Sequence, residues 1–127
     1  MAAVSEYVRP DHSNPYKTWF DSLNFQAAVT IATARAKIEA GKNSSMKSLG
    51  AGLWEFRIDT GPGFRIYLTM EGTEIVILFG GGTKKGQQAD IIRAKELLKE
   101  YKSRKAVERK AKRLERSQGK NKKKGKQ

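Results

Sequence analysis

Apolar and polar residues alternate along two segments in the middle of the chain. Residues 53–59 (LWEFRID) and 64–70 (FRIYLTM) each carry an apolar side chain at every second position. A period of two predicts half-buried β-strands. Residues 74–80 (EIVILFG) are almost continuously apolar, which predicts a central strand buried on both faces. The middle of the chain is therefore predicted to form three consecutive strands, with turns at 60–63 and 71–72.

Helical spacing dominates on either side of these strands. Residues 13–23 (SNPYKTWFDSL) and 24–41 each begin with helix-capping residues, and Gly41 closes the second helix. After residue 90, apolar residues recur every three or four positions as far as Tyr101, and we expect this helix to continue into solvent and end near Ser117. A short strand is predicted at 5–10 (SEYVRP). The predicted class is α+β, with the order β-α-α-β-β-β-α: about four antiparallel strands, with an N-terminal helical hairpin and a C-terminal helix grouped on one side.

The alternation also assigns side chains to the two faces of the sheet. If Trp54, Phe56 and Ile58 face the helices, their polar neighbours face away from them. Keeping the faces consistent places Arg57 opposite Arg65 and Glu55 opposite Tyr67, because a slip of one residue would bury Arg65. This register requires a connection of three or five residues, whose glycines supply positive φ angles. Arg65 and Tyr67 are thus predicted to point off an open face.

Two arginines directly opposite each other on a sheet repel. A bound phosphate would relieve the repulsion, because guanidinium groups form forked hydrogen bonds to phosphate. Alternatively, Glu55 and Asp59 neutralise both arginines on a solvated face. The sequence leaves these two interpretations open.

The loop at 80–88 (GGGTKKGQQ) brings further positive charge towards the same face. Its lysines, Lys84 and Lys85, stand beside glycines whose backbone N–H groups could meet an anion, although the spacing alone favours a loop that only turns the chain. The spacing is not that of a phosphate-binding Walker A motif. Lys47, in the polar segment 41–52, could reach the same face.

Composition narrows the classes of protein. The chain of 127 residues is long enough for one domain and contains no cysteine and a single histidine, His12, so neither a cofactor nor a metal site is predicted. The N-terminus does not have the pattern of a signal peptide, and no apolar run is long enough to span a membrane. We expect a soluble, cytoplasmic protein.

The net charge of +13 is concentrated at the C-terminus. Residues 102–127 contain 13 Lys and Arg against two acidic residues, a net charge of +11. We therefore divide the chain into a domain at 1–101 and a basic extension at 102–127, helical at first and then disordered. Such an extension either binds RNA or DNA through its charge or is merely a solvated tail.

The residues from Lys47 to Leu98 resemble the addiction-module killer proteins of the RelE/ParE toxin superfamily and are close to the HigB-type toxins. One motif is the turn and strand G-P-G-[FY]-R-[IV]-Y, at 61–67. The other is G-G-x-K-x-x-Q-x-x-D-I, spread here over Gly82, Lys84 or Lys85, Gln88, Asp90 and Ile91. The resemblance extends over about residues 6–101.

The resemblance implies a toxin of a type II toxin–antitoxin module: a metal-independent, ribosome-dependent mRNA endoribonuclease that inhibits translation and arrests growth. Its partners would be the ribosome, mRNA and a cognate antitoxin, a small helix-turn-helix protein encoded by an adjacent gene. Two alternatives remain. One is a non-enzymatic inhibitor of DNA gyrase, as in the ParE branch, and the other is a non-toxic nucleic-acid-binding domain.

The resemblance also suggests roles for individual residues. Arg57, Arg65 and Lys84 occupy the positions of catalytic basic residues, and Glu55, where some relatives have lysine, is a candidate general base. Some relatives carry a histidine or tyrosine near Asp90. The candidate RNA-binding residues are Lys47, Tyr67, Lys85, Gln88, Lys105, Lys110 and Arg113.

Overall fold

One five-stranded sheet forms the centre of the molecule, with helices on both of its faces. The computed structural model describes residues 2–125, with side chains up to residue 118. The sheet has the order β1-β5-β4-β3-β2. Its strands are β1 (Ala3–Glu6), β2 (Met46–Gly50), β3 (Leu53–Ile58), β4 (Phe64–Glu71) and β5 (Ile75–Thr83). The helices are α1 (Pro15–Asp21), α2 (Phe25–Glu39) and α3 (Gln87–Gly125), with a short 3-10 turn, η1 (Lys84–Gly86), before α3.

The α+β class is confirmed, but the predicted sheet was incomplete. It has five strands rather than four, because β2 pairs with the outer edge of β3. The strand β2 was missed because its sequence, MKSLG, is half-exposed and shows no alternation. The sheet is also mixed rather than antiparallel, since β1 runs parallel to β5. As predicted, β5 lies inside the sheet, between β1 and β4, and β4 is the middle strand of the five.

Two asparagines start the first two helices. The Asn14 side chain accepts a hydrogen bond from the backbone N–H of Lys17, and Asn24 does the same for Ala27. Pro15 occupies the first turn of α1, where its missing N–H costs nothing. These signals were correctly predicted from the sequence.

Each face of the sheet has its own apolar core. On the α1/α2 face, α1 and α2 pack on alternate residues of β3 and β4, among them Phe56, Ile66 and Leu68. On the α3 face, residues of α3 such as Ala94 and Leu98 pack on the opposite alternation. The prediction that all helices lie on one side is therefore wrong, because α3 covers the face that was expected to be open.

The predicted register between β3 and β4 is confirmed. Arg57 lies opposite Arg65, and Glu55 lies opposite Tyr67. The connection spans the five residues 59–63, within the predicted length. Gly61 has a φ of 61° and Gly63 a φ of 74°, so both adopt the left-handed conformation that glycine tolerates best.

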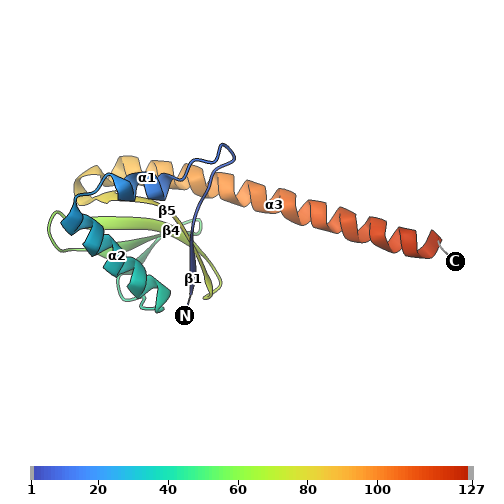
Figure 1. Cartoon of the computed structure of the whole chain (residues 1–127), viewed down its shortest axis with the longest axis horizontal. Helices are drawn as coiled ribbons and strands as arrows, with labels where there is room; N and C mark the ends of the chain where they lie inside the picture. Colours follow the sequence, from blue (N-terminus) through green and yellow to red (C-terminus); the bar gives the residue numbers. More distant parts are fainter. Residues whose placement is uncertain (1, 126–127) are drawn as a thin grey trace.

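The helix α3 extends far beyond the sheet (Figure 1). It remains attached to the body as far as Arg104, whose Nη1 donates to the carbonyl of Val8 at 2.7 Å, while Lys102 Nζ donates to the carbonyl of Ala51 at 2.6 Å. It continues to Gly125 rather than ending near Ser117. The division at residue 101 stays a prediction, since α3 crosses it without a break. No helix within residues 2–125 is long and apolar enough to cross a membrane.

Candidate functional site

The candidate site lies on the α3 face, where two rows of side chains cross the sheet. In one row, Lys47 of β2 lies opposite Glu55 of β3, which lies opposite Tyr67 of β4. In the next row, Arg57 lies opposite Arg65. Directly opposite residues of antiparallel strands point to the same side. The two rows therefore bring four of the predicted site residues, and the candidate base Glu55, onto one face.

Three of these side chains are buried beneath α3. The exposed fraction is 0% for Glu55, 1% for Arg65 and 1% for Tyr67. We call these three residues the buried polar cluster. The prediction that Arg65 and Tyr67 point off an open face is wrong, because the apolar stripe of α3 packs against that face.

The buried polar cluster is incompletely hydrogen-bonded. Among the described side chains, three buried polar atoms lack a hydrogen-bond partner: Glu55 Oε1, Arg65 Nε and Tyr67 Oη. Leaving a buried polar atom unpaired costs about 1–3 kcal/mol. The three unpaired atoms lie together in neighbouring rows of one face. Such a cluster lowers the stability of the fold and is typical of a functional site.

Carboxylates accompany both arginines. Arg57 Nε lies 3.6 Å from Glu55 Oε1, and Arg65 Nη1 lies 3.6 Å from Asp59 Oδ1. This is the neutralisation that the sequence left open. Both separations are longer than the 2.7–2.9 Å typical of a charge-assisted hydrogen bond. Arg57 remains 43% exposed, whereas Asp59 is 88% exposed and covers little of Arg65.

Lys84 lies beside Arg65 at the turn between β3 and β4. The backbone N–H of Lys84 donates to the carbonyl of Gly63 at 2.8 Å. A Cβ atom on Gly63 would lie 3.4 Å from Lys84 Cβ and 3.9 Å from Arg65 Nη1. The glycine thus lets the loop after β5 approach the turn, and three predicted catalytic residues, Arg57, Arg65 and Lys84, share one end of the sheet.

Two residues at the start of α3 complete the site and were not identified as members from the sequence. Gln87 Nε2 donates to Glu55 Oε2 at 3.2 Å. The carboxylate of Asp90 lies directly over Gly82, where a Cβ atom would be only 1.9 Å from Asp90 Oδ2. Gln88, the predicted residue, is exposed instead. No local pattern distinguishes Gln87 from Gln88, because the choice depends on how α3 turns over the sheet.

Burial also changes the chemistry of Tyr67. Burial, together with the nearby charges of Asp90 and Glu55, raises the pKa of its hydroxyl to about 12 from the ordinary value of 10.0. Tyr67 is therefore a neutral hydroxyl near neutral pH, able to donate a hydrogen bond but not to act as a base.

The other predicted RNA-binding residues lie further away. Lys85 is exposed in η1. Lys105, Lys110 and Arg113 lie on α3, and at about 1.5 Å per residue Lys105 is about 27 Å along the helix from Gln87. The structure therefore does not bring the residues of the extension into the site.

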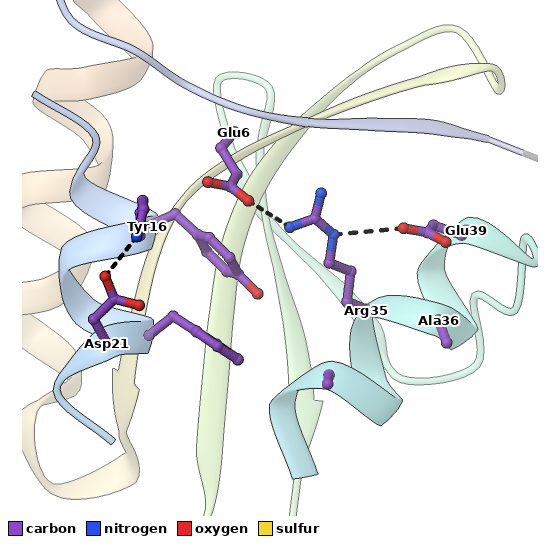
Figure 2. Close-up of a pocket in the computed structure, with 9 residues that line it drawn as sticks. Glu6, Tyr16, Asp21, Arg35, Ala36 and Glu39 are labelled. Carbon is purple, nitrogen blue, oxygen red and sulfur yellow. Dashed lines mark hydrogen bonds and ion pairs between the residues drawn. The ribbon is translucent and has the colours of Figure 1, made fainter. Parts of the chain in front are cut away.

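A second hollow, of about 470 Å³, lies between α1 and α2 on the opposite face (Figure 2). Its charges are already paired: Arg35 contacts Glu6 at 2.6 Å and Glu39 at 3.4 Å. The hydrogen bond from Arg35 lowers the pKa of Glu6. Because these groups satisfy one another, this hollow is a weaker candidate for a site than the buried polar cluster.

The described residues contain no group of three or more His, Asp or Glu side chains placed to hold a metal ion. The groups at the site are the guanidinium groups of Arg57 and Arg65, the ammonium group of Lys84, the carboxylate of Glu55 and the phenol of Tyr67.

Comparison with known proteins identifies the family. Residues 18–102 match the family described as phage derived protein Gp49-like (DUF891). An uncharacterized protein of Haemophilus influenzae is 36% identical over 86 residues, which cover 67% of this chain and 87% of that protein. The match includes both rows of the site and the first part of α3. The chain belongs to the Gp49-like family of phage-derived proteins, a RelE-like toxin family of toxin–antitoxin systems.

Proposed function

We propose that the protein is a toxin that cleaves mRNA on the ribosome and so inhibits translation. The observation that supports this most strongly is the opposed pair Arg57 and Arg65, with Lys84 beside them, in a chain of a RelE-like toxin family. Cationic side chains at one place on a rigid sheet suit a phosphodiester whose negative charge grows in the transition state. A cognate antitoxin is the partner that the family implies.

The proposed reaction uses the RNA's own 2′-hydroxyl. Its oxygen attacks the adjacent phosphorus, the bond from phosphorus to the 5′-oxygen breaks, and the products are a 2′,3′-cyclic phosphate and a 5′-hydroxyl. One proton leaves the 2′-hydroxyl and one is taken up by the departing 5′-oxygen. Arg57 and Lys84, both exposed, contact the phosphate, and Arg65 stabilises its charge from the neighbouring strand β4.

Glu55 can serve this reaction in two ways. As the general base, its free Oε1 takes the proton of the 2′-hydroxyl, which requires α3 to uncover it. As a counter-ion, it orients Arg57 from beneath, 3.6 Å away. A Glu55→Gln variant separates the two roles: loss of the acidic limb in the pH profile of cleavage indicates the base, and an unchanged profile with reduced rate indicates the counter-ion.

The test is primer extension on an mRNA translated with and without the protein. We expect ribosome-dependent cleavage by the natural chain and a loss of about 100-fold or more in Arg57→Ala, because one stabilising group for the transition state is removed. Arg57 is half-exposed, so this variant should fold. Arg65→Ala is a second variant, and its folding is checked by circular dichroism.

Lys17→Ala is the matched control. Lys17 is an exposed basic residue of α1 that lines the hollow between α1 and α2 and pairs with Asp21 at 2.7 Å, and cleavage should remain unchanged. Intact mRNA together with accumulated cleaved plasmid DNA would contradict the proposal and support gyrase inhibition. An effect that depends on Lys110 and Arg113 but not on Arg57 would support a nucleic-acid-binding domain acting through its extension.

A further inference from the structure

A groove of about 560 Å³ lies between α1 and α3, beside the buried polar cluster. It forms where β1 ends: β1 pairs with β5 only as far as Leu78, so on that edge the next residues of β5 have α1 beside them instead of a strand. Three consecutive glycines, Gly80, Gly81 and Gly82, line the groove and send no side chain into it. The volume is in the range of small-ligand sites.

The walls of the groove are aromatic and apolar. Trp19, which is half-buried, lines the groove together with Tyr67 and Phe79, whose side chains are almost completely buried. A Cβ atom on Gly81 would lie 2.4 Å from the Trp19 ring, so the glycine is needed for that ring to lie against the strand. A flat apolar slot beside bare backbone suits a planar ligand.

Two charged groups stand at the α3 side of the groove. Arg93 Nη2 donates to Asp90 Oδ1 at 2.6 Å, and the Arg93 side chain is 70% exposed. Among the described residues Asp90 Oδ2 accepts no hydrogen bond. The groove therefore offers a free carboxylate oxygen as an acceptor, with a guanidinium beside it that can meet a phosphate.

The groove also adjoins the proposed cleavage site. Gly80 lies opposite Tyr67 and Gly82 lies opposite Arg65, so the groove is one strand away from the buried polar cluster, about 5 Å. Arg57 lies on β3, two strands and about 10 Å from β5, so an RNA strand whose phosphate rests at Arg57 would reach the groove with a base further along the strand.

We propose that this groove binds a single base of RNA and favours a base with an exocyclic amino group, such as cytosine, over uracil. This inference rests on the proposed function for the identity of the ligand. Unstacked bases are commonly recognised by aromatic rings and by hydrogen bonds to their edges. The carboxylate of Asp90 accepts a hydrogen bond from an amino group, whereas uracil has a carbonyl oxygen at the position of the cytosine amino group, and that oxygen would repel the carboxylate.

The test is fluorescence anisotropy of the full chain with labelled hexaribonucleotides of cytosine or of uracil, without ribosomes. The two oligonucleotides have the same phosphates and differ in the base edge. We expect the natural chain to bind the cytosine oligomer about tenfold more tightly. Thr18→Trp places a large ring in the groove from the exposed face of α1, and the ratio should fall to about one while binding of the uracil oligomer persists through phosphate contacts.

Thr33→Trp is the matched control, because Thr33 is an exposed threonine of α2 outside the groove. This variant should still bind the cytosine oligomer about tenfold more tightly than the uracil oligomer. Asp90→Asn should reduce the preference in the natural groove, since an amide also presents a donor. Thermal melts of all variants establish that they are folded.

Two outcomes would overturn the inference. One is equal binding of both oligomers by the natural chain. The other is that Thr18→Trp still prefers the cytosine oligomer over the uracil oligomer. If this variant keeps that preference but no longer binds the antitoxin, the groove is a protein-docking surface. Both outcomes are independent of mRNA cleavage. A protein that prefers the cytosine oligomer but does not cleave mRNA would refute only the proposed function. A protein that cleaves mRNA but shows no preference between the oligomers would refute only the base-binding role of the groove.

Discussion

The two faces of the sheet are built from the same alternating strands but have opposite characters. On the α1/α2 face the buried side chains are apolar, with Ile31, Ile66 and Leu68 fully buried. On the α3 face an apolar core meets a buried carboxylate, a buried guanidinium and a buried phenol, each with an unpaired atom. Burial of apolar area stabilises a fold, whereas burial of incompletely paired polar groups destabilises it.

This difference shows which face of the sheet stabilises the fold and which face carries destabilising groups. The α1/α2 face provides stability, and the α3 face carries groups that reduce stability and are useful only if they contact a ligand. Removing an apolar side chain from the α1/α2 face and removing an unpaired polar atom from the α3 face should therefore change the free energy of unfolding with opposite signs.

The largest effect is expected on the α1/α2 face. Ile66 is 0% exposed, and Ile66→Ala removes buried methyl and methylene groups and leaves a cavity in the core. We expect a loss of about 2–5 kcal/mol in the free energy of unfolding, measured by urea titration. A smaller loss than that caused by substituting an exposed residue would show that the α1/α2 face does not stabilise the fold.

Tyr67→Phe should have the opposite sign. It removes a buried hydroxyl that has no hydrogen-bond partner, and we expect a gain of about 1–3 kcal/mol in the same measurement. Tyr7→Phe is the matched control, because the Tyr7 hydroxyl donates to Glu100 at 2.8 Å, and its loss should destabilise the protein. If both tyrosine substitutions destabilise, the contrast between the faces fails.

The dependence of stability on alkaline pH is a second test of the buried Tyr67 hydroxyl. The pKa of Tyr67 is raised from 10.0 to about 12, so folding favours its neutral form. This contribution is fully present below pH 10 and is lost as the pH rises from 10 towards about 12, by about 1.4 kcal/mol per pH unit. Urea titrations between pH 9 and pH 11 should give a shallower decline for Tyr67→Phe than for the natural chain. The two declines would be equal if Tyr67 kept an ordinary pKa.

The smallest effect is expected outside both faces. Leu114 lies on the projecting part of α3 and is 56% exposed. Leu114→Ala should change the free energy of unfolding by no more than about 0.5 kcal/mol, because no core is lost. A change as large as that of Ile66→Ala would mean that the projecting helix packs on the body or on another chain, which analytical ultracentrifugation would detect.

Much of the site followed from alternation alone. A period of two fixes which side chains share a face, and two strands with the same period keep one face apolar only in registers that differ by an even number of residues, among which the length of the turn selects one. This reasoning correctly placed Arg57 opposite Arg65 and assigned positive φ angles to the glycines between them. The positions of Lys84 and Lys47 near that face followed from the order of the strands.

The tertiary structure decided which face is covered. The apolar stripe of α3 shows that the helix must pack, but a helix of that pattern can lie on either face of a sheet. By packing over Leu53, Tyr67 and Phe79, α3 buried the residues that the sequence had placed in the open, and it brought Gln87 and Asp90 to them.

The strand β2 was missed for the same reason, because it depends on contacts between distant segments. Its five residues carry no alternating pattern, and the strand exists because the edge of β3 supplies partners for its backbone. The sequence by itself determined β3, β4 and β5, the register between β3 and β4 and the arginine pair, because these depend on local periodicity. Only the tertiary structure decided the buried polar cluster and the groove beside it, because both arise where α3 meets the sheet, and contacts between distant segments leave no periodic signal.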